Sequence, residues 1–197
     1  QKVGAILAKR GADGNSAVGR LLVAERTGEV SLRGLARKAI AEKIGKEEEV
    51  AFLATVLVAP FLRVCAKPLR WKVDLESVLA QRCPICGGAP LMAKLRAEDG
   101  KRMLECSLCN TQWAFKRLKC SFCGNEGQDS LGFFFVDKES PYRVDKCDKC
   151  KRYIKTVDER KGDKPRALPV EDAATLYLDL LAEKEGYQSI REPLWKE

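Results

Sequence analysis

Cysteine is the residue type in this sequence whose spacing most clearly suggests chemistry. Eight of the nine cysteines stand in four C-x-x-C pairs. A C-x-x-C turn presents two thiolates on one side of the backbone, and structural zinc and iron sites take four thiolates in a tetrahedron. The spacing therefore predicts metal binding rather than a disulfide framework. The pairs are Cys83 and Cys86, Cys106 and Cys109, Cys120 and Cys123, and Cys147 and Cys150.

A repeat in the sequence indicates which pairs share a metal ion. Each half opens with a C-x-x-C-G knuckle, continues through two strand-like runs separated by a turn, and ends in a second knuckle. Gly87, Gly124 and Asn110 follow three of the knuckles, where a positive φ is often needed. An interleaved arrangement, with the first pair joined to the third and the second to the fourth, is the alternative. The repeat predicts one site from Cys83, Cys86, Cys106 and Cys109, and another from Cys120, Cys123, Cys147 and Cys150.

The expected role of these sites is mainly structural, and the chain is not expected to be an enzyme. Sites of four cysteines are closed, whereas a catalytic zinc keeps an open position. The sequence contains no histidine, which removes the commonest general base. It also has no phosphate-binding glycine loop and no nucleophile elbow. Redox chemistry is the remaining active option, because four thiolates hold iron as well as zinc. The two metal ions are therefore predicted as zinc or iron.

Strands must position the knuckles. Runs with strand character alternate with knuckles and turns from residue 83 to about 160. They give each half the layout of a rubredoxin-like or zinc-ribbon module. The runs are 90–95, 102–106 and 111–118 in the first half, and 131–136, 142–147 and 152–157 in the second.

Helices are predicted on both sides of these modules. One is expected over 31–44, a second over about 47–70 with a kink or break at Pro60, and a short one over 75–80. The second helix is apolar all round and should be central in the core. A C-terminal helix from residue 169 or 170 to about 185 should place one apolar face against the N-terminal helices. That face is formed by Ala173, Leu176, Tyr177, Leu180 and Leu181.

The predicted fold class is therefore α+β. A helical domain over 1–82 precedes two tandem modules, over 83–119 and 120–160. A loop and the C-terminal helix over 161–197 then pack back on the helical part.

Charge and hydropathy limit the possible classes of partner. The formal net charge of +8 suggests nucleic acid, but residues 83–160 carry 15 cationic against 11 acidic side chains. Eight thiolates with two divalent ions would cancel that excess, which argues against a nucleic-acid partner. The apolar run over 50–62 is too short to span a bilayer. No signal peptide is recognised at the start of the sequence.

Three residues outside the knuckles attract attention. Trp113 and Arg117 lie four apart and could point to one face as a partner anchor. A tryptophan packed over a knuckle, with the arginine stacked on it, is the alternative. The isolated Cys65 is interpreted as a small buried hydrophobe rather than a reactive thiol.

These motifs resemble the FdhE family of formate dehydrogenase accessory proteins. The matching strings are CPICGG, CSLCNTQW, RLKCSFCGN, YRVDKCDKCKRYIKT and VEDAATLYLDLLAEKEGY. Trp113 and Arg117 fall in the family's W-x-x-x-R-x-x-C-x-x-C-G signature. The family has R-x-E where this chain has Arg143-Val-Asp145. The resemblance covers residues 83–191 and, more loosely, 46–80. The helical region is shorter than the family norm.

The resemblance implies a function that the residues alone do not supply. Family proteins are cytoplasmic and assist the assembly of membrane-associated formate dehydrogenases, acting on the catalytic subunit before export. Trp113, Arg117 and Arg143 are the candidate partner-binding residues. One alternative is an iron-binding redox or oxygen-sensing protein that acts in metalloenzyme maturation. A second is a zinc-ribbon protein that binds nucleic acid.

Overall fold

The computed structural model describes residues 48–162 and 167–189. The chain divides into two compact units, Gln1–Ala59 with Trp195–Glu197, and Pro60–Leu194. The helix expected over 31–44 and most of the helical domain expected over 1–82 lie outside the described residues. The second unit contains both groups of paired cysteines.

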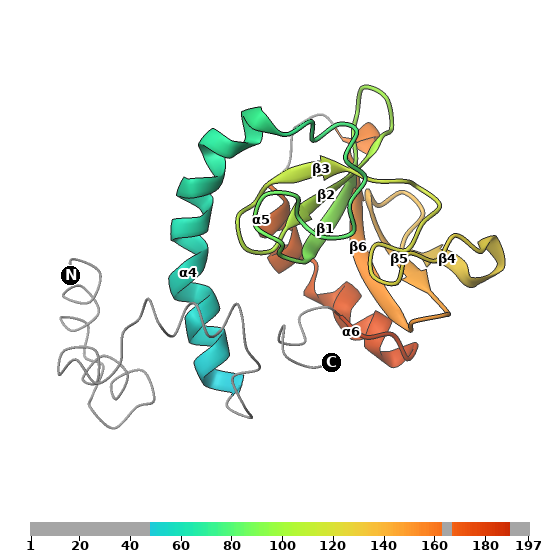
Figure 1. Ribbon diagram of the computed structural model, residues 1–197. Coiled ribbons are helices and arrows are strands. Elements are labelled where there is room, and N and C mark those ends of the chain that lie inside the picture. Colours follow the sequence, from blue (N-terminus) through green and yellow to red (C-terminus); the bar gives the residue numbers. More distant parts are fainter. Residues whose placement is uncertain (1–47, 163–166, 190–197) are drawn as a thin grey trace. The chain divides into compact units, whose positions relative to one another are not determined.

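The described residues form one six-stranded sheet in the order β3-β2-β1-β6-β5-β4 (Figure 1). Three strands have the bounds that the sequence predicts. The strand β6 extends one residue further, and β3 and β4 are shorter than predicted. The strands are β1 (Pro90–Leu95), β2 (Arg102–Cys106), β3 (Gln112–Ala114), β4 (Leu131–Phe134), β5 (Tyr142–Cys147) and β6 (Arg152–Asp158).

The two predicted modules share this sheet. Each module contributes three antiparallel strands. The first strand of one module, β1, pairs in parallel with the last strand of the other, β6, so that Ala93 lies opposite Thr156 and Leu95 opposite Asp158. The prediction of two groups of three strands is confirmed, but the two groups are parts of one continuous sheet. Backbone hydrogen bonds join them edge to edge.

The first module carries the largest described hydrophobic cluster. Leu104, Phe115 and the sulfurs of the first cysteine group pack around Trp113, which is fully buried. The indole Nε1 of Trp113 donates a hydrogen bond to the carbonyl oxygen of Ala80 at 2.6 Å. A buried indole N–H needs such a partner. The tryptophan therefore fastens the segment that enters the first knuckle onto the sheet.

The C-terminal segment forms two helices instead of one. They are α5 (Leu168–Ala174) and α6 (Leu176–Lys184). Leu168 packs with Met92 and Val157 of the sheet, and Leu178 packs with Val144 among its neighbours. The buried face of these helices thus lies on the sheet, and most of the N-terminal helical part on which it was expected to pack lies outside the described residues.

The prediction of which residues of this segment are buried is also wrong, because the buried face includes acidic residues. Leu176 and Leu180 are exposed, whereas Asp172 and Asp179 are buried. Lys155 of β6, only 2% exposed at its side chain, lies 2.9 Å from Oδ1 of Asp172 and 2.8 Å from Oδ2 of Asp179. Hydropathy assigns such charges to the surface, although pairing makes their burial possible.

The segment that leads into the first knuckle begins with α4 (Glu48–Leu69), which continues through Pro60 without a break. Phe61 and Val64 are 65% and 67% exposed, so this part of the helix is not central in the core as predicted. Cys65 is exposed, contrary to its interpretation as a buried hydrophobe. A turn occupies the place of the helix expected over 75–80. No helix in the described ranges is long and apolar enough to cross a membrane.

Candidate metal centres

The first cluster brings together the four cysteines that the sequence repeat assigns to one site. Their sulfurs all lie within 4.8 Å of one another. Sγ of Cys83 is 3.5 Å from Sγ of Cys109, and Sγ of Cys86 is 3.4 Å from Sγ of Cys106. Sulfurs that share a tetrahedral zinc ion at about 2.3 Å stand about 3.8 Å apart. A small outward adjustment of the sulfurs would therefore admit an ion, and three of the four cysteines are buried.

The second cluster has the same construction but is nearer to solvent. Its four sulfurs also lie within 4.8 Å of one another. Sγ of Cys120 is 3.7 Å from Sγ of Cys150, and Sγ of Cys123 is 3.8 Å from Sγ of Cys147. Cys123 is exposed. In the structure the first C-x-x-C pair thus groups with the second, and the third with the fourth, as the repeat predicts. The interleaved alternative is not observed.

Each knuckle is shaped by the residue after its second cysteine. That residue has a positive φ in all four knuckles, the conformation in which glycine is least strained. The backbone N–H groups of Leu108 and Phe122 each donate to the first sulfur of their knuckle at 3.4 Å. The sequence indicated three of the four positive-φ residues and missed the lysine. They are Gly87 at 74°, Asn110 at 55°, Gly124 at 72° and Lys151 at 54°.

One position distinguishes the two clusters. Gly88 and Asn125 are equivalent in the repeat, since each accepts a backbone hydrogen bond at 2.8 Å from the first cysteine of its module. A Cβ at Gly88 would lie 2.8 Å from Sγ of Cys106. At Asn125 the chain carries a full side chain, whose Nδ2 lies 3.8 Å from Sγ of Cys147. The first cluster therefore has no room for a side chain at this position, whereas the second cluster accommodates the side chain of Asn125.

Arg70 and Thr111 support the first cluster from outside. The hydroxyl of Thr111 lies 3.1 Å from Sγ of Cys109. Arg70 donates from Nη2 to the carbonyl oxygen of Cys109 at 2.8 Å and from Nε to the hydroxyl of Thr111 at 3.2 Å. Such outer contacts fix the orientation of a metal ligand. Neither contact can be predicted from the sequence, because no local pattern ties residue 70 to a knuckle 39 residues away.

Proton binding competes with metal binding at these thiols. A hydrogen bond from Cys106 lowers the pKa of Cys109, and the same contact raises the pKa of Cys106. In the second cluster, burial is the main cause that raises the pKa of Cys150. Thiols with raised pKa values hold their protons at neutral pH, and an arriving cation must displace those protons. The affinity of both clusters for metal should therefore fall as the pH falls.

The three candidate partner-binding residues have different surroundings. Trp113 has no exposed surface, so the prediction that it anchors a partner is wrong for the structure as described. Arg117 does not stack on it and is exposed, beyond the end of β3. Arg143 is half-buried on β5. Arg117 and Arg143 come from different modules and line the same cleft.

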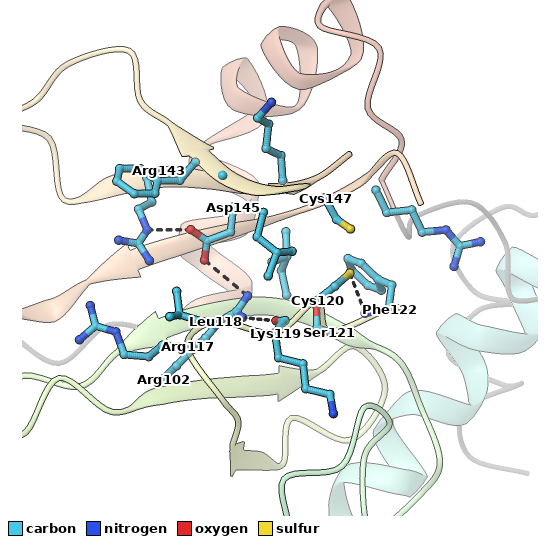
Figure 2. A pocket seen from close by; sticks show the side chains of 16 residues that line it. Arg102, Arg117, Leu118, Lys119, Cys120, Ser121, Phe122, Arg143, Asp145 and Cys147 are labelled. Carbon is cyan, nitrogen blue, oxygen red and sulfur yellow. Dashed lines mark hydrogen bonds and ion pairs between the residues drawn. The ribbon is translucent and has the colours of Figure 1, made fainter. Parts of the chain in front are cut away.

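An arginine–aspartate cluster joins the two modules beside this cleft (Figure 2). Arg102 of β2 is 3% exposed, and its Nη2 lies 3.4 Å from Oδ2 of Asp145 on β5. Nε of Arg143 lies 2.8 Å from Oδ1 of the same carboxylate, which also accepts from the hydroxyl of Thr156 at 2.8 Å. In the sequence, Asp145 stands out only as a shorter acid in a family motif, and Arg102 carries no signal.

Comparison with family models finds two matches that adjoin. The model described as "FdhE, central domain" matches residues 82–117. The model described as "FdhE, C-terminal domain" matches residues 118–193. The boundary between the matches falls between the two modules, and together the matches cover more than half of the chain.

Individual proteins give the same result. The protein FdhE homolog of Aquifex aeolicus is 38% identical over 120 residues, which is 59% of this chain and 42% of that protein. Protein FdhE of Escherichia coli K12 is 37% identical over 110 residues, which is 54% of this chain and 35% of that protein. The matched part thus spans less than half the length of these relatives.

A solved structure shares the fold. The crystal structure of the FdhE protein from Pseudomonas aeruginosa superposes with a TM-score of 0.67 at 24% sequence identity. The match covers 97% of this chain and 68% of that chain.

Proposed function

Because the chain belongs to the FdhE family, we propose that it is a non-catalytic accessory protein for the formation of formate dehydrogenase. It acts in the cytoplasm and binds the catalytic subunit of that enzyme before export. The two cysteine clusters each hold one divalent metal ion, and the ions mainly maintain the shape of the surface that meets the client.

The observation that carries this proposal is the coincidence of the family matches with the structural unit. Residues 82–193 include all six described strands and both four-cysteine clusters. The family likeness therefore covers the metal-binding fold itself. The proposed client, formate dehydrogenase, comes from the family. The proposed non-catalytic role is supported by the two metal sites, because each is closed by four cysteines in the described residues.

A structural role for the metals is supported by where the clusters lie. Cys106 and Cys109 have no exposed surface and belong to the same hydrophobic cluster as Leu104 and Trp113. An ion that joins four thiolates from two knuckles supplies folding free energy that a small three-stranded module lacks. Removal of the ion should therefore loosen the core around Trp113 as well as the knuckles.

One observation favours a second candidate function at the second cluster. Cys123 is exposed, so an iron ion held there would be within reach of dissolved oxygen and small reductants. The alternative is therefore an iron site that senses oxygen or passes electrons during maturation of the client. In such a site the exposed thiolate is the ligand most easily oxidised.

Co-purification tests the proposed function. The full chain should co-elute with the catalytic subunit of formate dehydrogenase from its own organism, and should restore formate dehydrogenase activity to a strain that lacks its own FdhE protein. A secreted enzyme unrelated to formate dehydrogenase serves as the control client. Failure both to bind the catalytic subunit and to restore activity would contradict the proposal.

A further inference from the structure

A cleft of about 420 Å³ lies at the junction of the two modules, beside the second cysteine cluster. Its lining comes from β2 of the first module, from the segment 117–122 that connects the modules, and from β4, β5 and β6 of the second. Figure 2 shows Arg117 and Arg143 reaching toward the same end of this cleft from opposite modules. The volume is that of an ordinary small-ligand site.

The cleft is cationic. Six of its lining residues carry a positive side chain, against the single carboxylate of Asp145 among the described residues that line it. A divalent ion held by the four thiolates of the second cluster would add two negative charges. Lys119 and Lys146 are also paired with Glu126 and Asp148 outside the lining, so about one positive charge remains in excess. The cations are Arg102, Arg117, Lys119, Arg143, Lys146 and Arg152.

These cations are not all neutralised by the protein. Asp145 is shared by Arg102 and Arg143, while Arg117 and Arg152 form no ion pair within the described ranges 48–162 and 167–189. The pKa of Arg102 lies below its ordinary value, first because burial removes water and also because Arg143 and Arg117 repel its charge. An anion in the cleft would relieve that repulsion.

Two buried polar atoms on the cleft wall lack a partner. Arg102 and Ser121 are 3% and 2% exposed, and neither Nε of Arg102 nor the hydroxyl of Ser121 has a hydrogen-bond partner. Buried donors are nearly always satisfied in folded proteins. Both residues line the cleft, so its buried wall carries two polar groups that the protein itself leaves without a hydrogen-bond partner.

The mouth of the cleft is apolar. Leu118 and Phe133 line it and are 63% and 56% exposed. The guanidinium of Arg143 lies over the ring of Phe133 at 4.8 Å from its centre, which holds the arginine in place without neutralising it. A ligand with an apolar part next to its anionic group would therefore cover both surfaces.

We propose that this cleft is an oxyanion-binding site that takes the carboxylate or phosphate group of a ligand, with Arg117 and Arg143 as the exposed clamp and Arg102 and Ser121 as the buried wall. Guanidinium groups suit both oxyanions because their N–H donors match two oxygens at once. The apolar mouth accommodates the part of the ligand next to the anion. The inference does not depend on a formate dehydrogenase client, because the site lies within this chain.

Calorimetric titration of the zinc-loaded full chain tests the site at constant ionic strength. The probes are inorganic phosphate and the capped peptide Leu-Glu-Phe, with capped Leu-Gln-Phe as the uncharged control. Arg117→Gln should weaken binding of the charged probes about tenfold or more. A hydrogen bond between two charged groups contributes about 1.5–3 kcal/mol of binding free energy, which corresponds to at least a tenfold change in Kd. Lys149→Gln removes one exposed positive charge near the same cluster but outside the cleft, and should leave binding within about twofold.

The outcomes separate the two sources of the oxyanion. Tighter binding of Leu-Glu-Phe than of phosphate identifies a peptide carboxylate as the ligand class, and the reverse identifies a free phosphate group. The inference is overturned if neither charged probe binds, if Leu-Gln-Phe binds as tightly as Leu-Glu-Phe, or if Lys149→Gln weakens binding as much as Arg117→Gln. Arg117 is exposed and outside any described ion pair, so its substitution tests the site even if Arg143→Gln fails to fold.

Discussion

Gly88→Ala should damage the first metal site and spare the second. The new Cβ would lie 2.8 Å from Sγ of Cys106, 3.1 Å from Cδ1 of Leu108 and 3.3 Å from Sγ of Cys86. Two of these three atoms belong to metal ligands, whose distances to a bound ion normally stay within about 0.2 Å of standard values. Glycine is thus required at position 88 because the sulfurs of Cys86 and Cys106 lie too close to its backbone to leave room for a Cβ.

The magnitude follows from the cost of overpacking. Forcing one extra methyl group into a well-packed site costs about 1–3 kcal/mol. If that strain falls on the metal-bound form, the affinity of the first site should drop by about 5- to 150-fold. Competition with a chromophoric zinc chelator measures this drop, and the second site in the same molecule provides an internal reference.

Asn125→Ala is the matched control. Asn125 occupies the equivalent position in the second module, where a Cβ is already present, and its amide lies 3.8 Å from Sγ of Cys147. This distance is too long for a strong contact. The other hydrogen bonds of the side chain, to the hydroxyl of Ser130 at 2.7 Å and from the N–H of Gly127 at 3.3 Å, reach no sulfur, so the substitution should change neither affinity by more than about threefold. The reasoning is refuted if Gly88→Ala leaves the first site unchanged, or if it weakens both sites equally.

Three further predictions concern the joint between the sheet and the C-terminal helices, and the independence of the two metal sites. Lys155→Met leaves the buried carboxylates of Asp172 and Asp179 without their cation, so urea denaturation should show a loss of about 3–5 kcal/mol, whereas the exposed Lys184→Met should cost less than about 0.5 kcal/mol; equal effects would contradict the buried triad. Burial, followed by the hydrogen bond to Asp179, raises the pKa of Tyr153, so the stability that its protonated hydroxyl provides should be complete below pH about 10 and be lost as the pH rises further, a dependence that Tyr153→Phe should remove. Cys120→Ser should lower the bound metal from two equivalents to one, as measured by elemental analysis, and loss of both ions would speak against independent sites.

Much of the metal-binding part could be predicted from the sequence, because its signals are local. A knuckle is specified by two cysteines and the residue that follows them, and runs such as 142–147 alternate over a length that a strand can use. The repeat then groups the knuckles, since each module closes its own site. These features depend on residues close together in the chain.

The features that sequence analysis missed depend on contacts between distant segments. The parallel pairing of β1 with β6 joins residues 63 positions apart, such as Ala93 and Thr156, and neither strand carries a mark of it. The face of α5 and α6 was misread because Asp172 and Asp179 are buried opposite Lys155. Hydropathy cannot recognise a buried charge whose partner lies in another element.

The most direct test of the account is metal analysis combined with an optical spectrum, on the full chain purified without oxygen from its own host. We expect two metal ions per chain, held by eight thiolates, and loss of the circular-dichroism signal of the folded sheet when a chelator removes them. Two colourless zinc ions would support the structural role, and thiolate charge-transfer bands would favour iron. A chain without metal, with its paired cysteines oxidised to disulfides, would contradict the central claim.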